Sequence, residues 1–363
     1  MKKPFIVRKL SSAKTVFNPT TLKYVIGEQL FRISLPLIGL ADGYNFWRPK
    51  TIGVEPTTRC NLNCIMCARR YWDEEKNPIR DMPIDLFKER VLPYLHYGQN
   101  VILQCQGEPL LGKDFFEMIS ECKHKGCKVQ FNTNGILLKG YAGELVGENV
   151  DSITVSVDGI RSFKDIRGID ISSVIDGIHE INSVKRRAHK GSPVLGIEFV
   201  AMERNIRELP DLVTLAYSLE IKSVNVVHAI IHSRALLDQS LFKHPDLAQE
   251  YFDEAAYRAG RLRMKINLPP VRKTVKFCRQ PFEMMFINWD GTVRPCCIST
   301  LNEKGAIAIG NVKRSSLDEI WNSPEMRKLR VSLLKGKDFA EFCENCAMRE
   351  FCLDSHTRIL EKG

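Results

Sequence analysis

Short apolar segments alternate with amphipathic segments six times along the middle of the chain, and few folds accommodate this order. The apolar segments, which predict β-strands, are 51–55, 101–104, 128–132, 153–157, 194–201 and 223–229. The helical patterns between them are 84–94, 115–123, 136–146, 172–188 and 209–219. This alternation predicts a parallel sheet covered by helices. Because the chemistry of barrel-like parallel sheets lies at the carboxyl ends of the strands, the polar residues that follow each strand are the candidates for a site.

The size and composition of the chain predict a soluble protein. A chain of 363 residues with 44% hydrophobic residues can bury a large core without disulfides. The longest apolar run, 33–41, contains Pro36 and is far shorter than a membrane span of about 20 residues. The N-terminus does not read as a secretory signal, so we expect a cytoplasmic protein. Twelve cysteines in a reducing compartment point to metal or redox chemistry before disulfides.

The first 50 residues carry most of the positive charge. They contain nine Lys or Arg and two acids, which accounts for +7 of the net charge of +10. Within them, apolar residues recur at helical spacing and predict one face of an amphipathic helix. These residues are Leu22, Ile26, Leu30, Ile33 and Leu37.

Two interpretations of this N-terminal segment stay open. It could contact a membrane surface, an anionic substrate or a partner. It could instead bury its apolar face on the main domain and expose its cations, which is the interpretation that we favour. Two further basic clusters, at 185–187 and 261–276, lack interleaved aromatic residues. We therefore expect no nucleic-acid partner.

Three cysteines follow the first predicted strand with the spacing Cys-x3-Cys-x2-Cys. They are Cys60, Cys64 and Cys67. Three thiolates can hold three irons of a cubane cluster and leave the fourth iron open to a ligand. The same spacing would also place three small apolar side chains on one face of a buried helix. Zinc is a weaker alternative because no fourth ligand lies nearby. Pro56 and the polar run 57–63 predict a loop instead of a helix, and we favour the cluster.

With this motif, residues 51–352 resemble the radical S-adenosylmethionine (radical SAM) enzymes. Further matches follow the later strands in order. Gly107-Glu108-Pro109 is similar to the end of the family's Gly-Gly-Glu-Pro motif, although Gln106 replaces the first glycine. The resemblance implies the following residues in SAM binding: Gly107, Glu108, Pro109, Asn134, Ser156, Asp158 and Arg167.

The resemblance also implies the reaction type and the partners. A [4Fe–4S] cluster on the three cysteines would cleave SAM reductively to a 5′-deoxyadenosyl radical that abstracts a hydrogen from the substrate. A flavodoxin- or ferredoxin-type reductant would supply the electron. The protein would supply orientation and a dry cavity.

The C-terminal cysteines resemble a SPASM/twitch extension that holds auxiliary iron–sulfur clusters. The resemblance implies one auxiliary [4Fe–4S] cluster on four cysteines: Cys278, Cys296, Cys343 and Cys346. Asp290-Gly291 predicts a hairpin turn that would bring Cys278 and Cys296 to the same end. His356 stands where the two-cluster form has a further cysteine, so the layout is closer to the one-cluster twitch form. Structural zinc on the same thiolates stays open.

Other cysteines and histidines are weaker candidates. Cys105 near the mouth of the barrel could return a hydrogen atom to a substrate radical, and His228 at the end of the sixth strand could act as a base; either could simply be structural. We assign no role to Cys297, Cys352 or His356. Cys122 and Cys127 fit a structural role.

We therefore expect an α/β fold, a partial (β/α)6 TIM-like barrel with a small SPASM/twitch-like domain. The expected limits are a basic extension at 1–50, the barrel at 51–235, a helical linker at 236–275 and the cluster domain at 276–363. The expected function is radical-SAM hydrogen abstraction from a sugar, cyclitol or lipid-linked small molecule, with the auxiliary cluster in electron transfer. The alternatives are a ribosomal-peptide maturase and a non-enzymatic iron–sulfur or zinc protein. Peripheral membrane contact through 1–50 is a further hypothesis.

Overall fold

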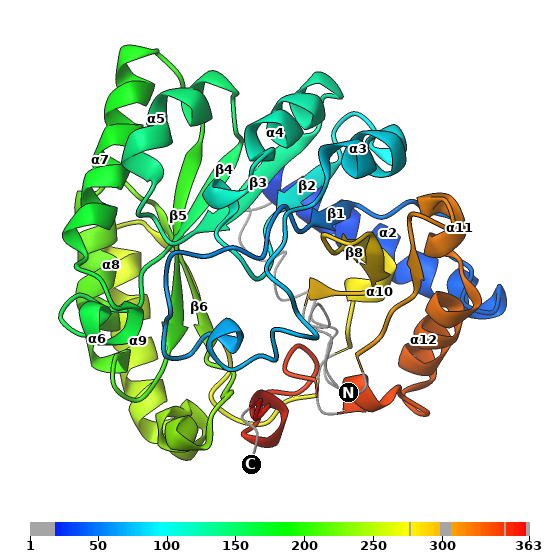
Figure 1. Cartoon of the computed structure of the whole chain (residues 1–363). Coiled ribbons are helices and arrows are strands. Elements are labelled where there is room, and N and C mark those ends of the chain that lie inside the picture. Colours follow the sequence, from blue (N-terminus) through cyan, green and yellow to red (C-terminus); the bar gives the residue numbers. More distant parts are fainter. Residues whose placement is uncertain (1–18, 276, 298–305, 345, 361–363) are drawn as a thin grey trace.

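One twisted sheet organises the molecule (Figure 1). The computed structural model describes residues 19–275, 277–297, 306–344 and 346–360. Ten strands lie in the order β10-β9-β8-β1-β2-β3-β4-β5-β6-β7. Their bounds are β1 Thr51–Val54, β2 Asn100–Leu103, β3 Lys128–Thr133, β4 Ser152–Ser156, β5 Val194–Ala201, β6 Ser223–His228, β7 Lys265–Asn267, β8 Met284–Ile287, β9 Thr292–Arg294 and β10 Gly310–Asn311. Pairing is parallel from β8 through β1 to β7, and antiparallel from β8 through β9 to β10.

The six predicted strands are present as β1 to β6, which confirms the partial (β/α)6 barrel. The predicted hairpin at Asp290-Gly291 is also present, since β8 and β9 pair across it and Gly291 has a φ of +86°. The sheet extends beyond the prediction at both edges, with β7 beside β6 and β8 beside β1. The parallel pairing of β8 with β1 joins the C-terminal hairpin directly to the barrel.

Helices cover the outer face of the barrel strands, as Figure 1 shows. The α-helices are α2 Pro19–Leu40, α3 Ile84–Leu86, α4 Phe115–His124, α5 Leu138–Gly147, α6 Phe163–Arg167, α7 Ser172–Arg187, α8 Leu209–Ser218, α9 Pro245–Arg261, α10 Gln280–Glu283, α11 Leu317–Trp321, α12 Pro324–Lys335 and α13 Glu341–Glu344. The predicted helix over 84–94 is irregular: α3 continues as a π-turn and ends in a 3₁₀ turn that contains Pro93, which has no N–H to donate.

Successive side chains of each barrel strand face alternately the surrounding helices and the barrel interior. On β5, Leu195, Ile197 and Phe199 are buried beneath the helices. Glu198 and Val200, which lie between them in sequence, line the interior cavity. This period of two residues is the reason that polar residues of the same strand can face a site while the strand still builds the core.

Helix α2 packs on the C-terminal part of the chain, but not through the predicted apolar stripe. Its buried side chains include Phe31 and Ile38. Leu30 and Ile33, from the predicted stripe, are each 63% exposed. The expectation that this stripe is buried on the main domain is therefore wrong for the residues whose side chains are described; Leu22 and Ile26 lie outside them. No helix in the described part of the chain is long and apolar enough to span a bilayer.

The segment expected to be a helical linker contains α9 and also contributes β7 to the sheet. Near the C-terminus, the chain returns to the exit of β6. Ile231 N donates to His356 O at 2.6 Å, and Arg358 N donates to Ile231 O at 2.7 Å. This pairing sets the end of the described chain beside the barrel opening. The domain limits stay predictions.

Candidate active site

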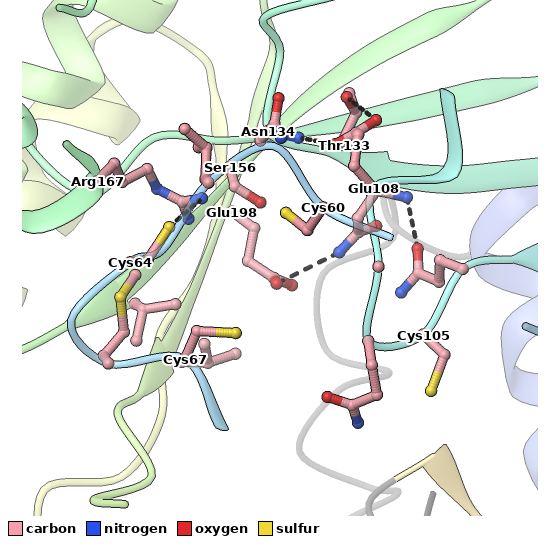
Figure 2. Close-up of a pocket in the computed structure, with 18 of the residues that line it drawn as sticks. Cys60, Cys64, Cys67, Cys105, Glu108, Thr133, Asn134, Ser156, Arg167 and Glu198 are labelled. Carbon is pink, nitrogen blue, oxygen red and sulfur yellow. Dashed lines mark hydrogen bonds between the residues drawn. The ribbon is translucent and has the colours of Figure 1, made fainter. Parts of the chain in front are cut away.

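A cavity of about 360 Å³ opens at the carboxyl ends of the barrel strands. Figure 2 shows the side chains that line it. Predicted site residues in its wall are Cys60, Cys64, Cys67, Cys105, Gly107, Glu108, Asn134, Ser156, Arg167 and His228. Two predicted SAM contacts are not in this wall. Pro109 is buried at the start of a short 3₁₀ turn, and Asp158 is wholly buried behind Arg167.

The three-cysteine motif forms a loop, so the alternative of a buried helical stripe is wrong. The loop is held at both ends. Thr57 Oγ1 donates to Asp81 Oδ1 at 2.6 Å before it, and the Tyr71 hydroxyl donates to Ile65 O at 2.7 Å after it. In the middle, Ile65 N donates to Ile166 O at 3.0 Å. These bonds fix the loop against the exits of other strands and turn its thiols toward the cavity.

Burial makes the three thiols poor candidates for free thiolates. It raises the pKa of Cys60 and Cys67, and it raises the pKa of Cys64 to about 11. A thiolate in this loop therefore needs a strongly cationic partner, as a metal centre would provide. No three His, Cys, Asp or Glu side chains in the described ranges converge tightly enough for a single ion. Because each thiolate of a cubane binds a different iron, the three cysteines need not converge in that way, and this donor set fits such a cluster.

Gly107 allows the loop after β2 to press against the start of the cysteine loop. A Cβ at this position would lie 2.4 Å from Thr57 O and 2.6 Å from Arg59 O. Next to it, Glu108 N donates to Arg59 O at 2.6 Å. Only glycine permits this approach. The replacement of the preceding glycine by Gln106 leaves the contact intact.

The Glu108 carboxylate is a structural brace between two strand exits. It accepts hydrogen bonds from Thr133 Oγ1 at 2.8 Å and from Asn134 N at 2.7 Å. Asn134 Nδ2 in turn donates to Asn61 Oδ1 at 2.8 Å, which reaches the cysteine loop. Burial raises the pKa of Glu108, whereas these hydrogen bonds lower it. Glu108 therefore holds the exits of β2 and β3 and the cysteine loop in one arrangement.

Arg167 places a buried positive charge beside Cys64. Its Nη1 lies 3.9 Å from Cys64 Sγ, and its Nε donates to Asp158 Oδ2 at 2.7 Å. Asp158 Oδ1 also accepts from Val200 N at 2.7 Å, which anchors the pair to β5. Asp158 thus positions Arg167 instead of contacting a ligand. The Arg167 charge lowers the pKa of Cys64 against the larger effect of burial, and so favours its thiolate.

Polar side chains of β5 and β6 form the far wall of the cavity. Asn132 and Asn225 donate to the two oxygens of Glu198 at 3.3 and 3.2 Å. His228 Nε2 lies 2.8 Å from Pro270 O. Because a carbonyl only accepts, Nε2 carries the proton and Nδ1 keeps its lone pair. Nδ1 of His228 is buried, and it has no hydrogen-bond partner among the residues that the structure describes.

Glu55 joins the cavity to the C-terminal hairpin. This carboxylate follows β1 directly and accepts from Asn288 Nδ2 at 2.9 Å and from Trp289 N at 3.3 Å. Burial raises its pKa, and a hydrogen bond from Cys105 is among the contacts that lower it. Cys105 therefore lies between the cavity and the hairpin that leads to Cys296. Nothing in the motif pattern marked Glu55; its position directly after a strand was the available signal.

The four C-terminal cysteines are neighbours of one another, although in the described part of the chain they do not converge on a single ion position. Burial raises the pKa of Cys343 to about 12, and nearby Cys296, Cys346 and Cys278 add to the rise. Burial also raises the pKa of Cys278 to about 12, and Cys296 and Cys346 are its neighbours. The same four positions that the resemblance implied therefore lie within electrostatic reach of one another. All are thiols with no disulfide, so the donor set fits an iron–sulfur cluster.

The remaining cysteines differ in their surroundings. Cys122 on α4 and Cys127 directly before β3 are buried in the core, as a structural role requires. Burial raises the pKa of Cys297 to about 12, with Cys296 as its next strongest influence. Cys352 Sγ lies 3.6 Å from Ser355 Oγ in the C-terminal turn.

Two residues after β5 hold the strand exits together, and sequence reasoning missed their role. Asn205 Nδ2 donates to Asp158 O and to Val200 O at 3.0 and 2.9 Å. Glu208 accepts from the backbone N–H groups of Ile160 and Arg161, both at 2.7 Å.

Comparisons with known proteins agree with this geometry. Residues 54–214 match the family model described as the radical SAM superfamily, and residues 278–347 match the one described as an iron–sulfur cluster-binding SPASM domain. A probable GTP 3′,8-cyclase of Methanococcus maripaludis is 34% identical over 306 residues, which cover 79% of this chain and 94% of the relative. A tungsten-containing aldehyde ferredoxin oxidoreductase cofactor-modifying protein of Pyrococcus furiosus is 26% identical over 84% of this chain and 88% of its own length.

Solved structures show the same fold at low sequence identity. SuiB of Streptococcus suis bound to S-adenosylmethionine has a TM-score of 0.63 and 15% identity, over 96% of this chain and 86% of that one. Native anSMEcpe with bound AdoMet has a TM-score of 0.59 and 16% identity, over 77% and 84%. The family uses a [4Fe–4S] cluster and SAM, and its SPASM domain binds auxiliary iron–sulfur clusters. This chain is a radical SAM enzyme with a C-terminal SPASM domain.

Proposed function

We propose that this enzyme abstracts a hydrogen atom from a polar small molecule held in the cavity at the carboxyl ends of β1 to β6. One observation carries the proposal: Cys60, Cys64 and Cys67 share a cavity with the Gly107 loop and with the polar wall of β5 and β6. A metal-binding protein without catalysis would not need that wall. The volume of about 360 Å³ is in the range of ligand pockets, and the proposed cluster and SAM would occupy part of it.

The residues around the three thiols fit the cofactors of the family. Cys60, Cys64 and Cys67 would hold the [4Fe–4S] cluster, with SAM bound against the strand exits at Gly107, Asn134 and Ser156. When bound, the cluster would supply one electron to the sulfonium of SAM, and cleavage of SAM would give methionine and a 5′-deoxyadenosyl radical able to take a hydrogen atom from the substrate. The chain itself orients the ligands, keeps Arg167 beside Cys64 and excludes water.

The character of the cavity wall supports a small polar substrate. Gln104, Asn132 and Ser156 add amide and hydroxyl groups to the wall that contains Glu198 and His228. Arg167 is the one Lys or Arg among the lining residues that the structure describes, and Asp158 already compensates it. A polyanionic substrate would find no free cation in this wall. Hydroxylated compounds such as sugars, cyclitols or their lipid-linked forms fit better.

The names of relatives support a small-molecule substrate, but not the sugar or cyclitol class in particular. The curated relatives are named for GTP, for a coproporphyrin and for a cofactor. Peptide modification is the alternative, since anSMEcpe and SuiB were solved with peptides. These structures are only 16–17% identical to this chain, so they support the fold more than the substrate.

Cys278, Cys296, Cys343 and Cys346 would hold one auxiliary [4Fe–4S] cluster. Four protein ligands leave no open position for a substrate, so this cluster would act in electron transfer. Electrons that move between this cluster and the cavity would pass Glu55, which contacts both Cys105 and the β8–β9 hairpin. A flavodoxin- or ferredoxin-type protein would reduce the enzyme.

His228 and Cys105 are the proposed substrate-side groups. The Nδ1 lone pair of His228 would accept a hydrogen bond from a substrate hydroxyl. Asn places an acceptor near the position of Nδ1, whereas Gln reaches the position of Nε2. We therefore expect His228→Gln to lose substrate-stimulated 5′-deoxyadenosine formation and His228→Asn to keep part of it. The Cys105 thiol would return a hydrogen atom to the substrate radical. The Cys105→Ser variant tests this role, because it should still form 5′-deoxyadenosine but should no longer form the normal product.

The decisive experiment counts iron and sulfide per chain after anaerobic reconstitution, together with dithionite-dependent 5′-deoxyadenosine. We expect about eight irons in the wild type and about four in the Cys60/Cys64/Cys67→Ala variant, which should lose SAM cleavage. Cys343→Ala/Cys346→Ala should lose the other four irons. Cys122→Ala, a buried thiol away from both sites, is the control. An unchanged iron content in the Cys60/Cys64/Cys67→Ala variant would contradict the assignment of these cysteines to a cluster. Zinc in the C-terminal site would exclude the proposed role of that site in electron transfer.

Substrate class is tested with two fractions of a cell extract. Stimulation of 5′-deoxyadenosine formation by the low-molecular-mass fraction supports the proposal. Stimulation only by the peptide fraction would favour the alternative. Peripheral contact of residues 1–50 with a membrane belongs to the same proposal, because a lipid-linked substrate would be met there.

A further inference from the structure

The outward side of α2 is an apolar surface that the described part of the chain leaves exposed. Leu30, Ile33, Leu37 and Leu40 follow one another at helical spacing and are 63%, 63%, 46% and 86% exposed. The opposite side is anchored, with Phe31 and Ile38 buried. A helix that is apolar on both sides is normally buried on both. The exposed side of α2 is therefore built to meet something outside the domain.

Three aromatic side chains continue this apolar character directly after the helix. Tyr44, Phe46 and Trp47 are 40%, 64% and 49% exposed. The Phe46 ring centroid lies 5.1 Å from that of Tyr44 and 6.2 Å from that of Trp47. Aromatic residues with polar tips are typical of the boundary between hydrocarbon and water. Their exposure in one short segment distinguishes this region from single surface leucines, which need no explanation.

The charge of the neighbouring sequence identifies the kind of partner. Residues 1–27 contain six Lys or Arg and no acid, and between Gln29 and Ala41 the only charged residue is Arg32. An apolar helix face next to a polybasic sequence complements an anionic lipid surface, where cations meet the headgroups and leucines enter the acyl boundary. A second copy of the chain fits less well, because the same face on both copies would bring two segments of +7 together.

We propose that the outward face of α2, formed by Leu30, Ile33, Leu37 and Leu40, docks the enzyme flat on an anionic bilayer. This rests on the proposed peripheral contact of residues 1–50, and it identifies the face that makes the contact. Since α2 is anchored to the domain through Phe31 and Ile38, docking fixes the orientation of the whole enzyme relative to the lipid. The aromatic segment 44–47 would lie at the edge of the contact.

The test is sedimentation of the full-length chain with phosphatidylglycerol vesicles and with phosphatidylcholine vesicles at low salt. We expect the wild type to bind the anionic vesicles at least tenfold more tightly. The variant Leu30→Ser/Ile33→Ser/Leu37→Ser should bind them at least tenfold more weakly than the wild type. A matched control, Val194→Ser/Tyr217→Ser/Tyr257→Ser, removes three side chains that are 60%, 55% and 66% exposed elsewhere and should bind normally. Circular dichroism and melting confirm that both variants fold.

Several results would overturn the docking proposal. The first is wild-type protein that stays in the supernatant with anionic vesicles. The second is a Leu30→Ser/Ile33→Ser/Leu37→Ser variant that binds these vesicles as tightly as the wild type. The third is a wild type that is a dimer in light scattering while this variant is a monomer. The last result would make a second copy the occupant. Formation of 5′-deoxyadenosine in the same samples separates the two proposals: an active enzyme that ignores lipid refutes only the docking, whereas a lipid-bound chain that never cleaves SAM refutes only the radical chemistry.

Discussion

Arg167 donates from Nε to Oδ2 of Asp158 over 2.7 Å, and the two side chains are only 8% and 0% exposed. Neither charge has access to bulk water, so each depends on the other. The pair ties the exit of β4 to the cysteine loop, because Arg167 also reaches Cys64.

The Asp158→Asn variant should therefore be strongly destabilised. It leaves the Arg167 charge buried without its counterion, a change that typically costs about 3 to 5 kcal/mol. Denaturant unfolding of the apoprotein would measure the loss. Asp211→Asn, which breaks the exposed pair with Arg258, is the control and should change little. Equal stability of Asp158→Asn and wild type would show that the Asp158–Arg167 pair does not hold this region.

Gly107→Ala should damage the site without removing a functional group. The added methyl would lie 2.4 Å from Thr57 O, so the loop after β2 must move away from the cysteine loop. We expect SAM binding, measured by equilibrium dialysis of the reconstituted enzyme, to weaken at least tenfold. Gly140→Ala on α5 is a matched control, because a Cβ there meets nothing within 4 Å. It should stabilise the helix by about 0.5 to 1 kcal/mol. Normal SAM binding by Gly107→Ala would exclude a tight loop contact.

Local patterns in the sequence predicted the barrel well. Strand and helix periods, together with Asp290-Gly291, gave β1 to β6 and the C-terminal hairpin, because turn residues and apolar periodicity act over a few residues. The pairing of β8 with β1 was not predictable in this way. Thr51 pairs with Met284, and no short-range signal links two segments so far apart. The same limit applies to Glu55, whose partners Asn288 and Trp289 come from that hairpin.

The candidate site shows a second limit. Motif order placed Cys60, Cys64 and Arg167 in one cavity, but it could not separate residues that contact a ligand from residues that position others. Asp158 and Glu108 belong to the second kind, because their oxygens are already used by protein donors. On α2, periodicity found a stripe but could not tell which of two apolar sides is covered.

Cys297→Ser should leave the iron content unchanged. The proposed ligands Cys278, Cys296, Cys343 and Cys346 would supply four thiolates, and Cys297, which neighbours Cys296 and Cys346, would not be required. Iron and sulfide analysis after reconstitution would check this, with Cys296→Ser as the matched comparison that should lose about four irons. A loss of iron in Cys297→Ser that equals the loss in Cys296→Ser would instead make Cys297 a ligand.

The contribution of the buried histidines to the stability of the protein should fall as the pH is lowered through their range. Burial lowers the pKa of His228, His232 and His356 to about 4, from the ordinary value of 6.5. Between these values the three imidazoles bind more protons in the unfolded chain than in the folded chain, so their contribution to the free energy of unfolding rises with pH. This stability is complete above about pH 6.5 and is lost as the pH falls toward 4.

Melting of the apoprotein between pH 4.5 and pH 7.5 would check this dependence, at about 1.4 kcal/mol for each pH unit per imidazole. His232→Gln/His356→Gln should flatten the curve, because two of the three groups no longer titrate. The control is His179→Gln, an exposed position on α7, which should leave the slope unchanged. The slope is the readout instead of the melting temperature at one pH, because lost packing shifts the whole curve but not its steepness. An equally steep curve for the double variant would show that these imidazoles do not cause the acid sensitivity.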